Sequence, residues 1–187
     1  MRKRIALVLL LAVALPVSAS QWQNRIDLNQ FLTDANALHQ LAIRYTSAES
    51  RGQVFYIHGD GRVMLQQLPR ERGVWNSLVP TCNAHVPEDT VIALVKLLID
   101  EHFFDLPEKN FFFLYASDDP EEAVHIHSIV LRFGEDEAGR SFATGSYNGQ
   151  VETIPRRFAA IEAGLIHIRD IAFPPTKTCG MAPPATF

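Results

Sequence analysis

Apolar and polar positions alternate along much of the chain, and this pattern predicts β-strands. From residue 38 onward, Leu41, Ile43 and Tyr45 fall on one side of the chain, as expected of a strand with one solvated face. Further runs have the same β-type character, at residues 53–57, 62–68, 124–133 and 140–147. Residues 111–115 are apolar on both sides, which predicts a buried strand or a loop that fills the core.

Turn-forming residues separate these runs. His-Gly-Asp-Gly at residues 58–61 predicts a hairpin, because an Asp-Gly pair suits a type I′ turn with positive φ at both central residues. A calcium loop is disfavoured here, because no train of oxygen ligands follows Asp60. Residues 134–139 connect the last two runs, and residues 69–83 form a long connection.

Two segments have the spacing of amphipathic helices. The first begins at Pro87, followed by two acids that favour the positive end of the helix dipole, and it ends near His102. The second extends from Pro155 to about Ile171. Their apolar stripes are Val91, Leu94, Val95 and Leu98 in the first helix and Phe158, Ile161, Leu165 and Ile168 in the second.

The order of these elements predicts an α+β fold. Short links between strands favour an antiparallel β-sheet of about five to six strands, with the two main helices packed on one face. We expect an N-terminal arm at residues 20–37, which contains at most a short helix, and a single α+β domain at residues 38–173. A Pro-rich C-terminal tail occupies residues 174–187.

The first nineteen residues have the organisation of an export signal. A basic start at residues 2–4 precedes an apolar run at residues 5–15, and small residues end at Ala19. The apolar run is shorter than the roughly 20 residues that a spanning helix needs. We therefore expect a signal peptide at residues 1–19 and a soluble mature protein, periplasmic or secreted, with no stable membrane insertion after cleavage.

Removal of the signal changes the charge of the chain. The three basic residues at positions 2–4 leave 14 of 17, against 21 acids, so the mature net charge is −7 instead of −4. A nucleic-acid-binding protein needs a basic surface to neutralise phosphates. The acidic balance therefore argues against nucleic acid as a partner.

Cys82 and Cys179 are the two cysteines of the chain. In an exported, oxidising setting such a pair most often forms a disulfide, which here would pin the Pro-rich tail to the domain. A reactive thiol is the less favoured alternative, because neither cysteine lies in a C-x-x-C motif or beside a basic cluster.

His125 and His127 are the sharpest candidates for metal chemistry. Alternate residues of a strand share a face, so the two imidazoles could bind Zn²⁺ or Cu²⁺, with Asp118, Asp119 or Glu121 as a third ligand. The same face carries apolar residues of the strand, which favours two histidines at the rim of the core that hydrogen-bond their neighbours. Metal binding is therefore an alternative to a structural role.

A small hydrolase is a third possibility, although no catalytic motif stands out. Ser146 lies in a Ser-x-x-Gly context and not in the Gly-x-Ser-x-Gly of a nucleophile elbow. The acid pairs lie on expected turns, and no Gly-rich phosphate loop occurs. We therefore assign no catalytic residues and expect no cofactor.

Trp75 lies in a loop context that suits an interface anchor. We expect a non-enzymatic binding or interaction module of the bacterial envelope, because the chain combines an export signal and an acidic mature surface with no catalytic constellation. The partner would be an envelope protein or a small ligand, and the sequence does not fix an oligomeric state.

Part of the chain resembles small exported bacterial domains of unknown function. The resemblance lies in the hairpin motif I-x-x-D-G-x-V, at residues 57–63, then a helix, and then Phe-Phe-Asp-Leu-Pro at residues 103–107 as an F-F-x-L exit. It would cover roughly residues 38–172 and implies a fold only. The chain departs from the pattern at residues 109–111, where Lys-Asn-Phe stands in place of a Tyr-x-Asp exit.

Overall fold

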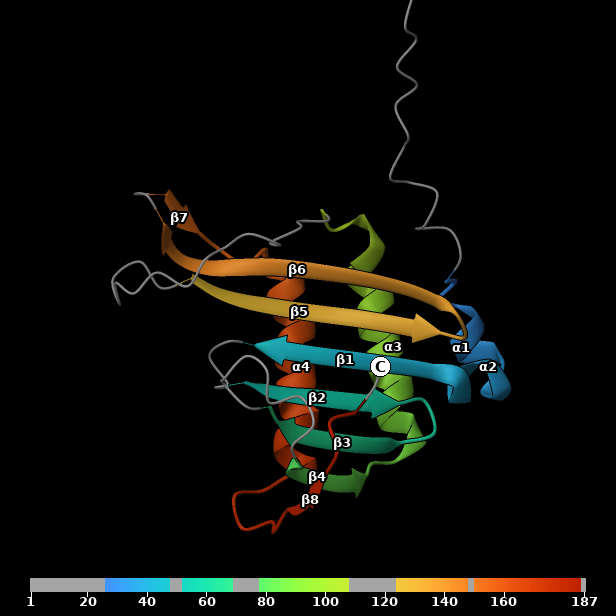
Figure 1. Ribbon diagram of the computed structural model, residues 1–187. Coiled ribbons are helices and arrows are strands. Elements are labelled where there is room, and N and C mark those ends of the chain that lie inside the picture. The colour runs from blue at the N-terminus through green and yellow to red at the C-terminus, as the bar shows by residue number, and fades with distance from the viewer. Residues whose placement is uncertain (1–25, 48–51, 69–77, 108–123, 148–149, 186–187) are drawn as a thin grey trace, which may run out of the picture.

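The protein is a sheet with helices on one side. The computed structural model describes residues 26–47, 52–68, 78–107, 124–147 and 150–185. Within these residues, one eight-stranded antiparallel sheet has the order β7-β6-β5-β1-β2-β3-β4-β8. Helices α3 and α4 both cross the same face of that sheet, whereas the short helices α1 and α2 lie at its end (Figure 1). The predicted α+β fold is confirmed, with more strands than expected.

The elements have the following bounds. The strands are β1 (Leu41–Ser47), β2 (Gln53–His58), β3 (Arg62–Gln67), β4 (Val79–His85), β5 (Val124–Phe133), β6 (Asp136–Tyr147), β7 (Gln150–Glu152) and β8 (Gly180–Ala182). The helices are α1 (Gln30–Thr33), α2 (Ala35–Gln40), α3 (Glu88–Asp100), α4 (Arg156–Ala172) and the 3₁₀ helix η3 (Phe103–Asp105).

The sheet consists of two meanders joined through their first strands. Strands β1 to β4 form the first meander and precede α3, whereas β5 to β7 form the second and precede α4. Strands β1 and β5 pair antiparallel at the centre, with Leu41 opposite Phe133 and Ser47 opposite His127. This register places His127 beside the end of β1 on the helix-covered face.

The hydrophobic core lies between the sheet and the two helices. Leu41, Ile43 and Tyr45 are buried on the helix side of β1, as the alternation predicts. Both predicted helix stripes are buried as well. Gly164 lets the helices approach closely, because a Cβ there would lie 2.8 Å from Leu97 Cδ2. Each fully buried Leu or Phe contributes about 1.5–3 kcal/mol to the fold.

The hairpin at residues 58–61 is confirmed, but its turn type is not type I′. Gly61 donates its N–H to the His58 carbonyl over 2.9 Å and takes a φ of 87°. Asp60 does not have a positive φ, which is the pattern of a three-residue loop that ends in a left-handed glycine. The Asp60 carboxylate instead accepts bonds from the backbone and side chain of Arg62, which lowers the pKa of this carboxyl against the opposing effect of partial burial.

Strand β4 occupies the second part of what we expected to be a long connection at residues 69–83. The sequence did not predict β4, because a proline such as Pro80 within a segment argues against a strand. The structure tolerates Pro80 near the sheet edge, opposite Met181 of the three-residue strand β8. The tail is therefore partly a strand, and Cys82 and Cys179 are paired there with Cα atoms 4.5 Å apart.

Other boundaries differ by a few residues. Helix α2 continues to Gln40, so the alternating pattern from residue 38 becomes a strand only at Leu41. Strand β6 begins at Asp136, because a two-residue connection with Gly134 at positive φ closes the hairpin earlier than expected. The expected arm contributes Ile26, Leu28 and Phe31 to the core.

Several predictions fall outside the described residues: the signal peptide, residues 111–115, the acids at 118–122 and Trp75. Among the helices in the described ranges, none combines the length and apolar character needed to cross a membrane.

Candidate functional site

His127 lies in a buried polar cluster beneath α4. The imidazole is 3 % exposed, and its Nδ1 lies 2.6 Å from Glu162 Oε1. Tyr45 donates its hydroxyl to the same carboxylate oxygen over 2.6 Å. On the other side of the ring, Nε2 lies 3.2 Å from Thr144 Oγ1. The Glu162 carboxylate therefore joins Tyr45 of β1 to His127 of β5, and His127 extends the cluster to Thr144 of β6.

The electrostatics of this cluster keep Tyr45 protonated. Burial raises the pKa of Tyr45 well above its ordinary value of 10.0, and the hydrogen bond to Glu162 and its negative charge add to that increase. Arg169 acts weakly in the opposite direction on the same pKa. The phenol is therefore a permanent donor to Glu162 at physiological pH.

One tautomer of His127 fits both hydrogen bonds of its ring. When Glu162 accepts from Nδ1–H, Nε2 can accept the Thr144 hydroxyl. A buried donor left without its partner costs about 1–3 kcal/mol. The cluster therefore fixes α4 on the sheet through oriented polar contacts.

The two predicted histidines share a strand face but have different surroundings. His125 is half-buried and lies opposite Thr144 in the β5–β6 register. In His127, Nδ1 contacts Glu162 and Nε2 contacts Thr144. Within the described ranges, no group of three or more His, Cys, Asp or Glu side chains is arranged to hold a metal ion. The carboxylates at 118, 119 and 121 lie outside those ranges.

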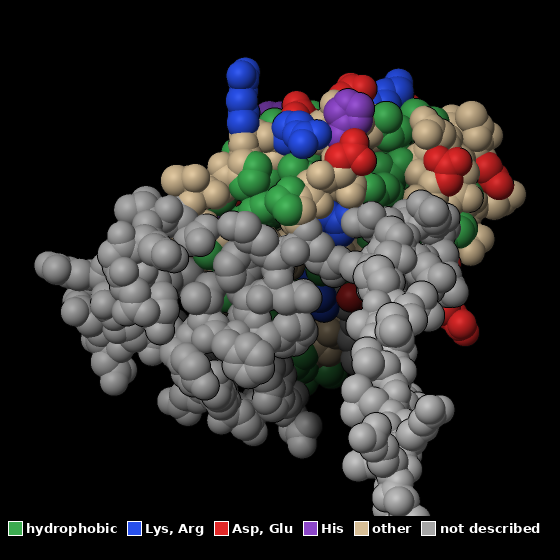
Figure 2. Space-filling model, turned by 90° about the horizontal axis from the view of Figure 1, so that it is seen from above, with side chains coloured by type: hydrophobic (Ala, Val, Ile, Leu, Met, Phe, Trp, Pro, Cys, Tyr) green, Lys and Arg blue, Asp and Glu red, His purple; other side chains and the backbone are tan. Residues whose placement is uncertain are grey.

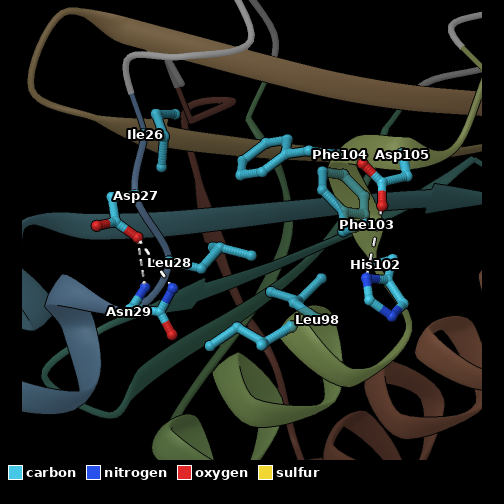
Figure 3. A pocket seen from close by; sticks show the side chains of 10 residues that line it. Ile26, Asp27, Leu28, Asn29, Leu98, His102, Phe103, Phe104 and Asp105 are labelled. Carbon is cyan, nitrogen blue, oxygen red and sulfur yellow. Dashed lines mark hydrogen bonds and ion pairs between the residues drawn. The ribbon is translucent and has the colours of Figure 1, made fainter.

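A pocket of about 200 Å³ opens where the N-terminal segment meets the end of α3. Figure 3 shows an apolar interior between the two segments, with polar side chains around it. The lining residues are Ile26, Asp27, Leu28, Asn29, Leu98, Ile99, His102, Phe103, Phe104 and Asp105.

The two aromatic residues of the pocket lining contact Arg140 of β6. This side chain is 2 % exposed, and its guanidinium lies 5.6 Å from the Phe103 ring centroid and 5.9 Å from that of Phe104. Its Nη2 also donates to the Phe104 carbonyl over 2.8 Å. Strand β6 therefore fixes both rings in place, which pre-forms this side of the pocket.

The opposite wall is shaped by a turn at the N-terminal segment. Asp27 Oδ1 accepts from the Asn29 backbone N–H over 2.9 Å and from Asn29 Nδ2 over 3.2 Å. This turn directs Ile26 and Leu28 inward, where they are 5 % and 6 % exposed, and leaves Asp27 at the surface. The chain here alternates between apolar wall and polar rim.

His102 connects α3 to η3 in an unusual backbone conformation. Its φ of 51° lies in the left-handed region that normally favours glycine at the end of a helix. The imidazole Nδ1 lies 3.5 Å from Asp105 Oδ2. The strained position is therefore occupied by a side chain that contacts a carboxylate at the pocket rim.

Sequence reasoning missed both the pocket and the partners of His127. The sequence does mark Glu162, because it is an acid beside Ile161 on the buried stripe of α4. For the pocket, the sequence shows only Phe-Phe-Asp-Leu-Pro at the end of the helix, which indicates a chain reversal and does not indicate a cavity. Trp75 lies outside the described residues.

Seen from above, the described part of the surface carries charges of both signs (Figure 2). In the view from above, Lys and Arg, Asp and Glu, and His side chains are interspersed along the upper part of the picture (Figure 2). On the described part of this face, no patch of a single sign stands out (Figure 2).

Comparisons with known proteins do not assign the chain to a family. No protein-family model matches it, and no curated protein is significantly similar to it.

Proposed function

We propose that this protein is an exported, non-enzymatic binding module of the bacterial envelope that holds a small ligand in the pocket between its N-terminal segment and the end of α3. The observation that carries the proposal is the pocket itself, which brings apolar side chains and polar groups together from two segments of the chain. This combination is typical of ligand sites, in which apolar walls supply affinity and a few polar groups supply orientation.

The buried walls support a pre-formed site. Leu98 and Phe103 line the pocket but are only 1 % and 0 % exposed, so the core holds these two side chains in place and they present little surface to a ligand. Their rotamers are fixed by packing, and a ligand would order few additional side chains when it binds. Low reorganisation cost favours affinity in a site of this small size.

Export is supported by features other than the pocket. Residues 1–19 have the sequence of a signal peptide, and the paired cysteines fit an oxidising compartment. Trp75 stays a predicted anchor for an envelope protein, tested by comparing the partners of the parent protein and Trp75→Ala.

The binding proposal can be tested with a rim variant that covers the pocket. Asn29→Trp places an indole at the pocket mouth, and Asn36→Trp places one on exposed α2 as the matched control. Saturable binding of 2-phenylethanol to the parent and to the control, but not to Asn29→Trp, supports the site. Equal binding by all three proteins would place the ligand elsewhere.

A second candidate, a small hydrolase, is favoured by one specific alignment. Thr144 Oγ1, the His127 ring and the Glu162 carboxylate follow one another in the order of a nucleophile, a base and the group that orients it. In such a reaction His127 Nε2 would take the hydroxyl proton as Thr144 Oγ1 attacked a carbonyl carbon and the π electrons moved onto the carbonyl oxygen. Collapse of this tetrahedral intermediate would break the bond to the leaving group, which would receive the proton from His127, and water would then hydrolyse the acyl-threonine by the same two steps. A fluorophosphonate probe that labels the parent protein but not Thr144→Val would support this candidate, and no labelling of either would remove it.

The metal alternative remains a separate proposal for His125 and His127. Titration with Zn²⁺ and Cu²⁺ tests it directly. Binding tighter than about micromolar that is lost in a double His→Ala variant supports it, whereas no binding excludes it.

A further inference from the structure

We propose that the pocket selects a ring-sized organic cation, meaning an apolar body of about one six-membered ring that carries an ammonium group. The inference rests on the proposed binding function and adds the chemical class of the ligand.

The volume sets the size of the apolar body. The pocket measures about 200 Å³. An engineered cavity of about 150 Å³ lined by Leu, Ile and Phe binds benzene. The pocket, which is open to solvent on one side, therefore has room for one ring and a short side chain.

The walls favour an apolar body. Ile26 and Leu28 face the pocket from the N-terminal segment, and Leu98, Phe103 and Phe104 face it from the end of α3 and from η3 (Figure 3). Ile99 and Phe104 are the half-buried apolar residues of the lining, so a ring in the pocket would displace water chiefly from these two side chains.

The rim supplies negative charge from two separate segments. Asp27 belongs to the N-terminal turn and Asp105 to η3, and both line the pocket. Figure 3 shows one carboxylate oxygen of Asp105 at His102 and the other turned toward Phe104. The contact with His102 thus leaves a second oxygen of Asp105 on the pocket side.

Arg140 decides where the ammonium group would lie. Its guanidinium already lies over the Phe103 and Phe104 rings within the protein, so a second cation on those rings would meet like charge. The ligand would therefore place its ring inward and its ammonium group outward, between the ring edge and the carboxylates. This orientation also keeps the charged group solvated.

The test uses three probes of nearly identical shape and different charge. Phenethylammonium, 2-phenylethanol and 3-phenylpropionate are titrated by calorimetry into the mature protein at neutral pH and low salt. We expect the cation to bind about threefold to fivefold more tightly than the alcohol, as exposed charge pairs allow, and the anion to bind most weakly. A higher salt concentration should weaken the binding of the cation and leave the binding of the alcohol unchanged.

The variant Asp105→Asn then assigns the preference to the rim. It should remove the advantage of the cation over 2-phenylethanol, whereas Asp89→Asn at the opposite end of α3 should leave the binding of both probes unchanged. If the parent protein binds the alcohol as tightly as the cation, the charge inference is wrong while the binding function stands. If none of the three probes binds, both fail. The salt dependence of the parent decides the matter should Asp105→Asn unfold.

Discussion

Glu162 shows how much one side chain can determine at the residue scale. A carboxylate on the buried stripe of an amphipathic helix would be costly alone, but this one accepts from Tyr45 and His127 within the core. Sequence reasoning placed His127 on the apolar face of its strand with a neighbour to bond. It could not identify that neighbour, because Glu162 is 35 residues away in the chain and Tyr45 is 117 residues from Glu162.

The hydrogen bond from Tyr45 to Glu162 should make stability depend on alkaline pH. The pKa of Tyr45 is raised in the folded protein, so this contribution is fully present below the ordinary value of 10.0 and is lost as the pH rises above it. The free energy of unfolding should fall above pH 10 with a slope of up to about 1.4 kcal/mol per pH unit from this group.

Tyr45→Phe supplies the comparison. It should lower stability at pH 7 by about 1–2 kcal/mol and reduce the decline at high pH, both measured by urea unfolding. Because Tyr56 also has a raised pKa, its Tyr56→Phe variant is the control for a general tyrosine effect. A decline above pH 10 that is identical in Tyr45→Phe and the parent would contradict the assignment.

Gly59 should be intolerant of any side chain for steric reasons. A Cβ there would overlap the carbonyl of Leu38, at the junction between α2 and β1. Gly59→Ala should lower the unfolding free energy by several kcal/mol or prevent folding, because backbone on both sides must move. Gly180→Ala, where a Cβ meets nothing within 4 Å, should lower the unfolding free energy by less than about 1 kcal/mol. Thermal unfolding of both variants and the parent protein measures the difference.

At the scale of elements, the spacing of apolar residues predicted the two main helices and most of the longer strands. The stripes of α3 and α4 and the strands β1, β2, β3 and β5 follow from the spacing of apolar residues. Strands β7 and β8 have three residues each, too few for a periodic signal, and they form only because a neighbour supplies hydrogen bonds. Pro80 hid β4 for a similar reason, since its tolerance depends on the position of the strand in the sheet.

The C-terminal tail is held by three kinds of contact. Strand β8 pairs with β4, Cys179 forms a disulfide with Cys82, and Gln66 hydrogen-bonds the end of the tail. Gln66 donates to the Pro183 carbonyl over 3.0 Å and accepts from the Ala185 N–H over 2.8 Å. The amide of Gln66 is 1 % exposed, so the tail also shields it from water.

Loss of the cysteine pair should destabilise the protein without changing its fold. The cysteines are 97 residues apart, for which the chain-entropy model allows up to about 4.7 kcal/mol. The double Cys82→Ser, Cys179→Ser variant should unfold at lower urea with unchanged far-UV circular dichroism, because β8 and Gln66 still hold the tail. Alkylation of the parent without reductant should label no thiol, and two labelled cysteines would refute the pairing.

At the scale of the whole molecule, the pocket arises from segments that are distant in sequence. Residues 26–29 meet residues 98–105 only because the N-terminal segment packs at the end of α3. In the sequence, residues 26–29 alone indicate an arm and residues 98–105 alone indicate the end of a helix. No local pattern therefore predicts the cavity. The arm is consequently part of the site in the proposed function.

Export should yield a shorter and more acidic protein than the full chain. Cleavage after Ala19 would remove the basic start and leave a net charge of −7, by loss of 3 of the 17 basic residues against 21 acids. Intact mass of the protein recovered from the periplasm or medium should correspond to a chain that begins at Ser20. Recovery of the uncleaved chain in the cytoplasm would contradict the proposed localisation.

The most direct test of the binding function is an amide NMR titration of the mature protein with 2-phenylethanol. Saturable shifts concentrated at residues 26–29 and 98–105, and absent in Asn29→Trp, are the result that a ligand in the pocket predicts. Shifts that are absent, do not saturate, or concentrate on another part of the chain would contradict it.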